Sequence, residues 1–244
     1  MQEATLSSTF LSVVVPVFNE LDSIAPLIQE IQTALTGQDY EIVYVDDGST
    51  DGSGALLKEL CQTVSELKVV QHSRSFGQSV AVLSGILAAH GQWIATLDGD
   101  GQNDPADIPN LLKRVQTTNC SPTLLIAGFR NKRRDTWLKR FSSKVANSVR
   151  AYLLKDNTPD TGCGLKLFQR AAFLELPHFK NMHRFLPALF LRNGWQVVSV
   201  EVNHRPRLQG ISKYGLHNRL WVGIVDLLGV LWLQHRPCKG EWLE

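Results

Sequence analysis

Short apolar runs alternate with amphipathic segments along the first half of the chain. Apolar runs rich in β-branched residues predict buried strands at 11–17, 40–45, 68–71, 93–97 and 124–127. Apolar residues at helical spacing predict helices between them, at 22–35, 53–64, 78–89 and 105–115. Strands that are apolar on both faces and alternate with helices indicate an α/β fold with a mostly parallel sheet flanked by helices. Ligands of such sheets bind at the carboxyl ends of the strands.

Basic residues dominate the segment that follows. Residues 130–155 contain nine Lys or Arg against one acid, Asp135. Apolar side chains recur among them at helical spacing, namely Leu138, Phe141, Val145, Val149 and Tyr152. The segment therefore predicts a basic amphipathic helix, whose apolar face either packs on the core or contacts a membrane.

A segment near the C-terminus, 220–233, is almost wholly apolar but is shorter than the roughly 20 residues that span a bilayer. A weakly polar seam recurs every third residue at Gly223, Asp226 and Gly229, and larger side chains cover the opposite side, namely Trp221, Val225, Leu228 and Trp232. Such a helix lies in a membrane interface, packs into a partner or completes the core, and we favour the interface. We expect one domain over 1–210 and an amphipathic membrane-interface or oligomerisation segment over 211–244.

The net charge of +2 hides two chemically different halves. Residues 1–129 hold 5 Lys or Arg against 15 Asp or Glu, a charge of −10, and the remainder holds 20 against 8, a charge of +12. The front half suits cations and sugars, whereas the back half suits phosphates and anionic surfaces.

Cysteine usage and the N-terminus bear on the compartment. The four cysteines form no CxxC pair, so the sequence suggests neither a zinc knuckle nor a disulfide framework, and a reducing cytosol fits best. Residues 1–10 lack the basic and apolar regions of a secretory leader. We therefore expect a domain that is not secreted.

The richest candidate chemistry follows the strand predicted at 93–97. Asp98, Asp100 and Gln102 point the same way if the segment is extended, while the glycines between them leave room for a bulky anion. Hard oxygen ligands of this kind suit Mg²⁺ or Mn²⁺ bound to a diphosphate. The alternative is an Asp/Gly-rich turn after a strand.

Two more polar segments, 16–20 and 46–51, follow predicted strands and are expected to meet 98–102 in one crevice. For Asp46 and Asp47 the alternative to ligand binding is a polar turn after a buried strand. No GxGxxG follows the first strand and no GxxxxGK[ST] occurs, so dinucleotide and P-loop folds lose their main support.

Four motifs in the front half resemble, in the same order, the motifs of a known protein family. PVFNE at 16–20 resembles a PxYNE segment, and DDGSTDG at 46–52 resembles DDGSxDG. SRSFGQ at 73–78 resembles an RNxG loop, and DGDGQNDP at 98–105 resembles a DxDxQxxP metal site. In this order they resemble family 2, GT-A fold glycosyltransferases, most closely the polyprenyl-phosphate sugar transferases that include the dolichol-phosphate mannosyltransferases.

The back half continues the resemblance. GFR at 128–130 is similar to a GxR segment, DTGCGL at 160–165 to a DxxSGF-type segment, and 207–213 to an RxxGxSK element that closes over the acceptor phosphate. HRFLP at 183–187 is typical of bacterial members. Cys163 replaces the usual Ser, and no transmembrane helix follows residue 236, which leaves the mode of membrane attachment open.

The resemblance implies a GT-A catalytic domain over 1–210 and a set of ligand contacts. Asp46 would read the base, Asp98 would lie at the ribose and metal edge, and Asp100 with Gln102 would hold Mg²⁺ or Mn²⁺. The donor-binding set is Pro16, Val17, Asn19, Glu20, Asp46, Asp47, Ser49, Arg74, Gly77 and Asp98.

The implied acceptor is a polyprenyl monophosphate, already an anionic nucleophile, so no strong general base is needed and transfer inverts the anomeric carbon. Guanidinium groups bind phosphate oxygens bidentately, although each basic candidate could instead be a surface ion-pair partner. The acceptor-phosphate candidates are Arg130, Arg140, Ser143, Arg207, Ser212 and Lys213. The catalytic set is Asp98, Asp100, Arg130, Arg207 and Lys213.

These observations favour an enzyme at the cytoplasmic side of the inner membrane, peripheral or interfacial, whose partners are a nucleotide sugar, a polyprenyl phosphate and the membrane surface. No nucleic-acid partner is expected, and a homo-oligomer is left open. The alternatives are a soluble family 2 enzyme with a glycan or other non-lipid acceptor and a non-catalytic nucleotide-sugar-binding protein. The sugar and the choice of UDP or GDP remain open.

Overall fold

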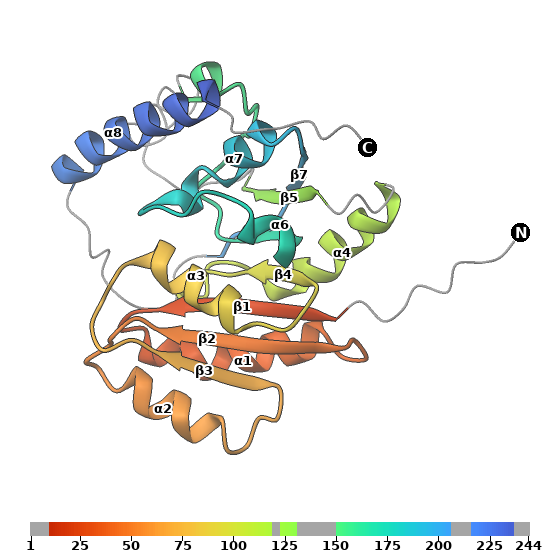
Figure 1. The fold of residues 1–244 in the computed structure, drawn as a ribbon. Coiled ribbons are helices and arrows are strands. Elements are labelled where there is room, and N and C mark those ends of the chain that lie inside the picture. The colour runs from red at the N-terminus through yellow and green to blue at the C-terminus, as the bar shows by residue number, and fades with distance from the viewer. Residues whose placement is uncertain (1–9, 119–122, 131–149, 206–215, 237–244) are drawn as a thin grey trace, which may run out of the picture.

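The structure, a computed structural model, describes residues 10–118, 123–130, 150–205 and 216–236. Its centre is a seven-stranded sheet with the order β3-β2-β1-β4-β6-β5-β7 (Figure 1). The strands are β1 (Leu11–Val17), β2 (Tyr40–Asp46), β3 (Leu67–Gln71), β4 (Trp93–Thr96), β5 (Leu124–Phe129), β6 (Lys166–Gln169) and β7 (Gln196–Glu201).

The sheet is parallel except at one strand. β1 pairs in parallel with β2 and β4, β2 with β3, and β5 with β7, whereas β6 runs antiparallel between β4 and β5. The expectation of a mostly parallel sheet is confirmed, but β6 and β7 were not predicted. Val17 pairs with Asp46 and Asp46 with Gln71, so the carboxyl ends of these strands share one edge.

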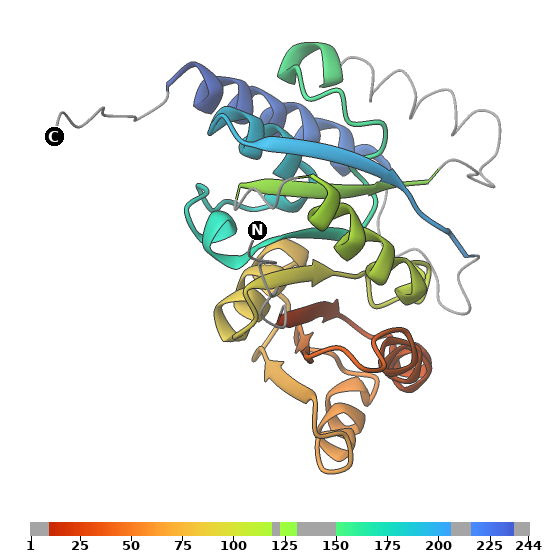
Figure 2. The ribbon, with the colours of Figure 1, turned by 90° about the vertical axis from the view of Figure 1, so that its right-hand side faces the viewer.

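Helices cover both faces of the sheet, as Figure 2 shows for α1 and α4 on one side and α3 on the other. One face carries α1 (Leu21–Ala34), α2 (Ser53–Leu60), the 3-10 helix η1 (Pro105–Asp107) and α4 (Ile108–Thr117). The other carries α3 (Gln78–Ala88), α6 (Arg170–Leu174), the 3-10 helix η2 (Met182–Arg184), α7 (Leu186–Arg192) and α8 (Leu216–His235). The predicted front-half elements exist with bounds shifted by a few residues, and the helix predicted at 105–115 begins as η1.

Strand β1 shows how the sequence builds two cores. Val13, Val15 and Val17 pack into the cluster beneath α1, whereas Val14, which points the opposite way, packs into the cluster beneath α3. A strand that is apolar on both faces is therefore buried on both faces, as the run at 11–17 predicts.

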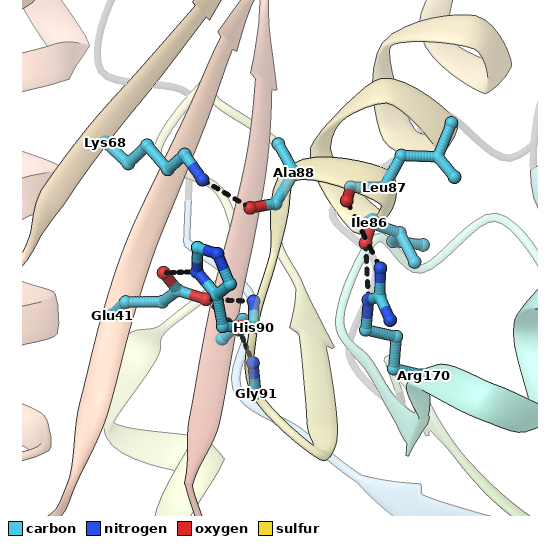
Figure 3. A network of polar contacts seen from close by, with 9 residues as sticks. Glu41, Lys68, Ile86, Leu87, Ala88, His90, Gly91 and Arg170 are labelled. Carbon is cyan, nitrogen blue, oxygen red and sulfur yellow. Dashed lines mark hydrogen bonds and ion pairs between the residues drawn. The ribbon is translucent and has the colours of Figure 1, made fainter.

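Cations hold the end of α3 that lies away from the site (Figure 3). Arg170 donates from Nε to the Ile86 carbonyl at 2.9 Å and from a terminal nitrogen to the Leu87 carbonyl at 3.2 Å, and Lys68 Nζ donates to the Ala88 carbonyl at 2.6 Å. These are orphan carbonyls of the last turn, where positive charge also complements the helix dipole. The helix is thereby fixed with its first residues at the carboxyl edge of the sheet.

The turn after α3 is fixed to the starts of β1 and β2. Glu41 accepts from Ser12 Oγ at 2.6 Å and from the His90 backbone N–H, and Ser12 Oγ accepts from Gly91 N at 2.8 Å (Figure 3). This network lies at the edge opposite the acidic loops and stabilises the fold there.

The basic segment departs from its predicted pattern where the structure describes it. Residues 131–149 lie outside the described part, and residues 150–154 are helical. Tyr152, predicted on the apolar face, is 83% exposed, whereas Arg150, counted among the basic residues of the amphipathic helix, is buried. Arg150 departs from the predicted basic face because it is paired inside the protein with Asp156, at 3.2 Å. The exposed Tyr152 agrees with an apolar face that this protein does not cover.

Helix α8 packs on the domain through one side. Val230 is fully buried, and Arg192 Nε donates to the Leu233 carbonyl at 2.8 Å. Part of the predicted apolar stripe faces outward, since Val225, Leu228 and Trp232 are 65%, 60% and 62% exposed. Within the described ranges, no helix combines the length and the hydropathy needed to cross a bilayer.

Candidate active site

Backbone and side-chain hydrogen bonds join the loops after β1 and β2 into one unit. Asn19 N donates to Ser49 Oγ at 2.8 Å, and Thr50 N donates to Asn19 Oδ1 at 2.7 Å. Glu20 N donates to Ser53 Oγ at 3.2 Å, so the bonds continue into the start of α2. The sequence-predicted donor residues Asn19, Glu20 and Ser49 are therefore held together at the carboxyl edge.

Asp46 is fully buried at the end of β2. Its carboxylate accepts from Ser49 N at 2.9 Å and from Gln71 Nε2 at 3.0 Å. A Cβ at Gly54 would come within 2.4 Å of Asp46 Oδ2, which shows how closely α2 covers this carboxylate. In this structure Asp46 closes the turn that presents the loop.

Asp47 organises the loop at 73–77. Oδ1 lies 2.7 Å from His72 Nδ1 and accepts from Phe76 N at 2.9 Å. Oδ2 accepts from Ser75 Oγ at 2.7 Å and from Gly77 N at 2.8 Å. Burial acts to raise the pKa of Asp47, but these four hydrogen bonds outweigh it and hold the pKa below its usual value. Asp47 therefore positions the predicted donor loop from beneath.

The two loops also touch through their backbones. Gly48 has φ of +75°, and a Cβ there would lie 2.5 Å from the Arg74 carbonyl carbon, so only glycine permits this approach. The exposed Arg74 places its guanidinium carbon 5.1 Å from the centroid of the Phe76 ring. Arg74 and Gly77, both in the predicted donor set, thus lie beside the loop that follows β2.

The loop after β4 is a turn rather than the extended segment that the alternation argument assumed. Gln102 N donates to Asp100 Oδ1 at 3.1 Å, and Gly101 has φ of +71°, so the chain bends between the two expected metal ligands. Asp98 N donates to Asn103 Oδ1 at 3.1 Å, which fixes the base of the turn. The segment is therefore an Asp/Gly-rich turn, and this shape is compatible with the predicted metal ligands.

A pocket of about 520 Å³ lies against this turn. Pro16, near the end of β1, lines it together with Asp98 and Gln102, which belong to the loop after β4 (residues 97–104, called the metal loop below). Side chains that are distant in sequence complete the lining. The pocket's other polar lining residues are Gln78, Thr96, Arg130, Asp160, Thr161, Cys163, Lys166, His183 and Arg184.

The pKa of Asp98 is raised in this pocket. Burial and the neighbouring Asp100 charge raise its pKa to about 6, although Lys166 and Arg130 act in the opposite direction. Its Oδ1 accepts from Gln78 Nε2 at 2.8 Å. Two mutually repelling carboxylates beside an amide oxygen are a donor set that a divalent cation would relieve.

A metal held here would depend on its substrate. Among the residues that the structure describes, no three His, Cys, Asp or Glu side chains form a preassembled metal cluster. Mg²⁺ and Mn²⁺ sites commonly use one or two carboxylates and complete their shells with water and phosphate oxygens. Asp100 and Gln102, with Asp98 beside them, fit this kind of site.

Arg130 follows β5 and enters the pocket in a fixed orientation. Its guanidinium contacts both Asp160 oxygens, at 2.6 Å from Nε and 3.0 Å from a terminal nitrogen. Burial acts to lower the pKa of Arg130, but Asp160 outweighs it and raises the pKa, so the group stays charged. Asp160 was not among the predicted site residues, because its partner lies 30 positions away.

The segment at 156–164 is held by two further buried cations. Arg150 donates to Thr161 Oγ1 and to the Thr158 carbonyl, and Lys166 Nζ donates to the Cys163 carbonyl. Burial lowers the pKa of Lys166. Sequence reasoning did not single out Lys166, since its importance comes from its antiparallel register opposite Thr96.

Gly164 brings this segment against the metal loop. Thr96 Oγ1 donates to the Gly164 carbonyl at 2.6 Å, and a Cβ at Gly164 would lie 2.3 Å from Asp98 Oδ2. Cys163, which stands in place of the usual Ser, is buried with Sγ 3.8 Å from Asn103 Nδ2. The absence of a side chain at Gly164 thus allows this segment to pack closely against Asp98.

The chain after β7 clamps the other side of the metal loop. Asn203 donates to both oxygens of Asp107, at 2.7 and 3.0 Å, and Arg205 lies 2.6 Å from Asp104 and 2.8 Å from Glu30. The loop is therefore fixed from both directions. The predicted acceptor residues Arg140, Ser143, Arg207, Ser212 and Lys213 lie outside the described residues.

Solved structures share this architecture. A mannosyltransferase from Pyrobaculum calidifontis, in complex with GDP-Man and Mn²⁺, aligns with a TM-score of 0.65 and 20% identity over 95% of this chain and 65% of its own. Glucosyl-3-phosphoglycerate synthase from Mycobacterium tuberculosis, in complex with Mn²⁺ and UDP-glucose, aligns with a TM-score of 0.65 and 21% identity over 95% of this chain and 81% of its own. The predicted GT-A type of α/β fold is confirmed.

The chain belongs to glycosyl transferase family 2, whose model matches residues 12–176. It is 34% identical over 240 residues to the dodecaprenyl-phosphate galacturonate synthase of Rhizobium johnstonii, covering 96% of this chain and 70% of the relative. It is 33% identical over 210 residues to the undecaprenyl-phosphate 4-deoxy-4-formamido-L-arabinose transferase of Edwardsiella ictaluri, covering 85% of this chain and 63% of the relative. The resemblance to polyprenyl-phosphate sugar transferases is confirmed.

Proposed function

We propose that this chain transfers a sugar from a UDP- or GDP-sugar to a polyprenyl monophosphate, with inversion at the anomeric carbon. The observation that carries this proposal is the pocket, in which Asp98 and Gln102 share one cavity with Arg130. Hard oxygen ligands and a fixed cation are what a nucleoside diphosphate and an acceptor phosphate require side by side. The two curated relatives named above carry sugar and polyprenyl phosphate in their names, which supports this acceptor class.

The reaction breaks the bond between the anomeric carbon and a diphosphate oxygen while an acceptor phosphate oxygen forms the new bond from the opposite face. The electron pair of the broken bond goes to the diphosphate, and no proton has to be removed from the acceptor. A Mg²⁺ or Mn²⁺ ion held by Asp100 and Gln102 would neutralise charge on the leaving diphosphate. Within this chain, Gln78 orients Asp98 and Asp160 orients Arg130.

The assignment of the acceptor residues remains a sequence-based prediction except for the placement of Arg130. Since Asp160 engages two guanidinium donors, Arg130 keeps further N–H groups for a phosphate oxygen. Arg140, Ser143, Arg207, Ser212 and Lys213 would complete the site. Their cationic members match the positive charge of the back half of the chain.

The test of this function is a product analysis. Purified protein is incubated with Mg²⁺ or Mn²⁺, a short polyprenyl phosphate and a panel of UDP-glucose, UDP-galacturonic acid, a UDP-aminoarabinose derivative and GDP-mannose. A lipid monophosphate sugar detected by mass spectrometry, with inverted anomeric configuration by NMR, is the expected product. Transfer to a non-lipid acceptor with no lipid product, or retained configuration, would contradict the proposal.

We further propose that α8 lies on the cytoplasmic surface of the membrane. Ile224, Val225, Leu228 and Trp232 are exposed apolar side chains on one helix, and such a stripe suits the interface between lipid headgroups and acyl chains. A polyprenyl acceptor would be reached from that position. The proposal accords with the segment's predicted role.

Liposome flotation tests this placement. The double variant Leu228→Ser with Trp232→Ser is expected to reduce binding to vesicles containing anionic lipid by about tenfold, because roughly 25 cal/mol is lost per Å² of apolar area no longer buried. Leu87→Ser is the matched control, since Leu87 is 58% exposed on α3. Equal binding by the double variant and the wild type would remove α8 from the membrane contact.

A further inference from the structure

His183 is a pocket residue that the proposed reaction does not yet use. It lies on η2, on a stretch distant in sequence from the metal loop, and lines the same cavity as Asp98 and Gln102. This cavity is the one in which the proposed function places the nucleotide sugar, so His183 is a candidate contact of the sugar. The inference therefore rests on the proposed function.

The ring is held in one orientation by α3. His183 Nδ1 lies 2.7 Å from Ser79 Oγ, and His183 N donates to the same oxygen at 3.3 Å. Ser79 follows Gln78, whose amide contacts Asp98 at 2.8 Å. Two consecutive residues at the start of one helix thus fix both Asp98 and the imidazole, which gives the ring a defined position relative to the metal loop.

With Nδ1 turned to Ser79, Nε2 is the remaining polar atom of the ring. No residue in the described ranges contributes a hydrogen bond to Nε2. A histidine that is locked on one side and lines a cavity with the other is arranged for a ligand. A ring packed wholly in the core would not line a cavity, whereas His183 forms part of the pocket wall.

The charge of the His183 ring limits which ligand groups it can bind. Burial lowers the pKa of His183 to about 3, and the positive charges of Arg184 and Lys166 add to the effect, so the ring is neutral at physiological pH. A neutral imidazole is a weak partner for a diphosphate but a good one for a hydroxyl, which both accepts and donates. Either ring tautomer therefore suits a sugar hydroxyl.

We propose that His183 is a specificity-determining residue for the donor, whose Nε2 forms a hydrogen bond with a hydroxyl group of the transferred sugar. Ser79 is its positioning residue. Sites built to hydrogen-bond a substrate hydroxyl discriminate strongly against analogues that lack it, because a polar atom is then left unpaired.

The experiment compares two variants that separate the ring nitrogens. His183→Asn keeps an amide group near the Nδ1 position but lacks a polar atom at Nε2, whereas His183→Gln extends one toward Nε2. Calorimetry measures the Kd of UDP and of the nucleotide sugar from the panel that the wild type binds most tightly, with Mn²⁺ present. His90→Asn is the matched control, because His90 lies at the opposite edge of the sheet.

We expect His183→Asn to weaken nucleotide-sugar binding about tenfold while leaving UDP binding unchanged, the size of one lost hydrogen bond. His183→Gln should recover most of that loss, and Ser79→Ala should show a smaller loss in the same direction. Deoxy-sugar donors identify the hydroxyl: one of them should bind the wild type about tenfold more weakly, yet bind His183→Asn no more weakly than the parent sugar does.

Three results would overturn the inference. They are unchanged nucleotide-sugar affinity in His183→Asn, an equal loss for UDP and for the nucleotide sugar, and a wild type that binds no nucleotide sugar of the panel. The last would also overturn the proposed function. A wild type that binds a nucleotide sugar but makes no lipid product would contradict the proposed function alone, because the binding measurements would still decide the role of His183.

Discussion

Two acidic turns lie at the same edge of the sheet, and their carboxylates behave differently. In the turn after β2, Asp46 and Asp47 are buried and accept hydrogen bonds from the loops around them. In the turn after β4, Asp98 lines a pocket beside Asp100, and its pKa is raised to about 6. The first turn satisfies its charges internally, whereas the second leaves a charge repulsion that a cation would relieve.

The difference shows that an acidic motif after a strand does not by itself define a ligand site. The number of hydrogen bonds that each carboxylate accepts from the protein distinguishes the two cases. A carboxylate whose acceptor positions are filled by the protein has few left for a ligand. Asp47 has four such partners, while Asp98 has the Gln78 amide and the opposing charges of Lys166 and Arg130. From this comparison we expect the first turn to act mainly as scaffold and the second to hold the reactive groups.

The largest effect expected from this comparison is on catalysis. Asp100→Asn should lower kcat/KM for transfer by about 1,000-fold, because the substitution removes a negative charge from the ligands that would hold a cation beside a diphosphate. The unfolding midpoint should stay within a few degrees of the wild type, since asparagine keeps a side-chain oxygen that can accept the hydrogen bond from Gln102 N. Steady-state kinetics with Mn²⁺ and thermal unfolding measure the two quantities.

Asp22→Asn makes the matched control for that variant, because Asp22 is an exposed acid in the first turn of α1. It should leave the kinetics unchanged. If the Asp100→Asn enzyme keeps full activity, or loses stability in proportion to activity, the turn after β4 is structural in the same way as the turn after β2.

Gly164→Ala should have the next largest effect. Its Cβ would meet both oxygens of Asp98, at 2.3 and 2.6 Å, so the carboxylate has to move or the segment at 160–164 has to shift. We expect a loss of about 100-fold in kcat/KM, the cost of misplacing a group near the reaction by about 1 Å. Gly229→Ala is the control, because a Cβ at that exposed helical position meets nothing within 4 Å.

For Gly229→Ala we expect unchanged activity and a gain of roughly 0.5–1 kcal/mol in the free energy of unfolding. Wild-type kinetics in Gly164→Ala would show that the Asp98 carboxylate moves freely, and the reactive turn would then be less rigid than the close packing implies.

Asp47→Asn tests the scaffold turn. An amide nitrogen at the Oδ2 position would face the Gly77 N–H, so two donors would oppose each other in a buried site. We expect a loss of about 2–3 kcal/mol in the free energy of unfolding, measured by urea denaturation, together with weaker nucleotide binding. The exposed Asp39→Asn variant is its control. A stable Asp47→Asn protein that loses only nucleotide affinity would make Asp47 a direct ligand.

The sequence predicts more of the donor half than of the rest, for a physical reason. Strands β1 to β4 are apolar runs whose patterns are local, so their existence and order could be predicted. Strand β6 is a four-residue segment that begins with a buried Lys166 and pairs antiparallel with β4. Its strand character depends on partners in space, which no local pattern records.

The same distinction holds in the site. Asp98 and Gln102 could be found because the motif places them together, and the structure brings both to the pocket. Asp160 lies in the recognised motif at 160–165, but its role could not be predicted because it acts through Arg130. Lys166 could not be found, because it acts through a backbone carbonyl. In the basic segment at 130–155, the exposed Tyr152 shows what periodicity cannot predict. Helical spacing identifies an apolar face but does not tell whether the protein covers it.

The smallest effect concerns pH and again separates pocket groups from scaffold groups. His183 has an ordinary pKa of 6.5 when unfolded and of about 3 when folded, so below pH 6.5 the unfolded chain binds a proton that the folded protein does not. This group therefore makes folding less favourable as pH falls from 6.5 toward 3. Asp98, whose folded pKa is raised to about 6, acts in the opposite direction over part of that range.

The difference between wild type and His183→Asn isolates the histidine, because Asp98 is common to both proteins. We expect the change in the free energy of unfolding between pH 7 and pH 5 to be less unfavourable in His183→Asn by about 2 kcal/mol. Urea denaturation at the two pH values measures it. Identical pH dependence in both proteins would mean that the folded His183 titrates as in the unfolded chain, and that the pocket wall is wetter than its packing against Ser79 indicates.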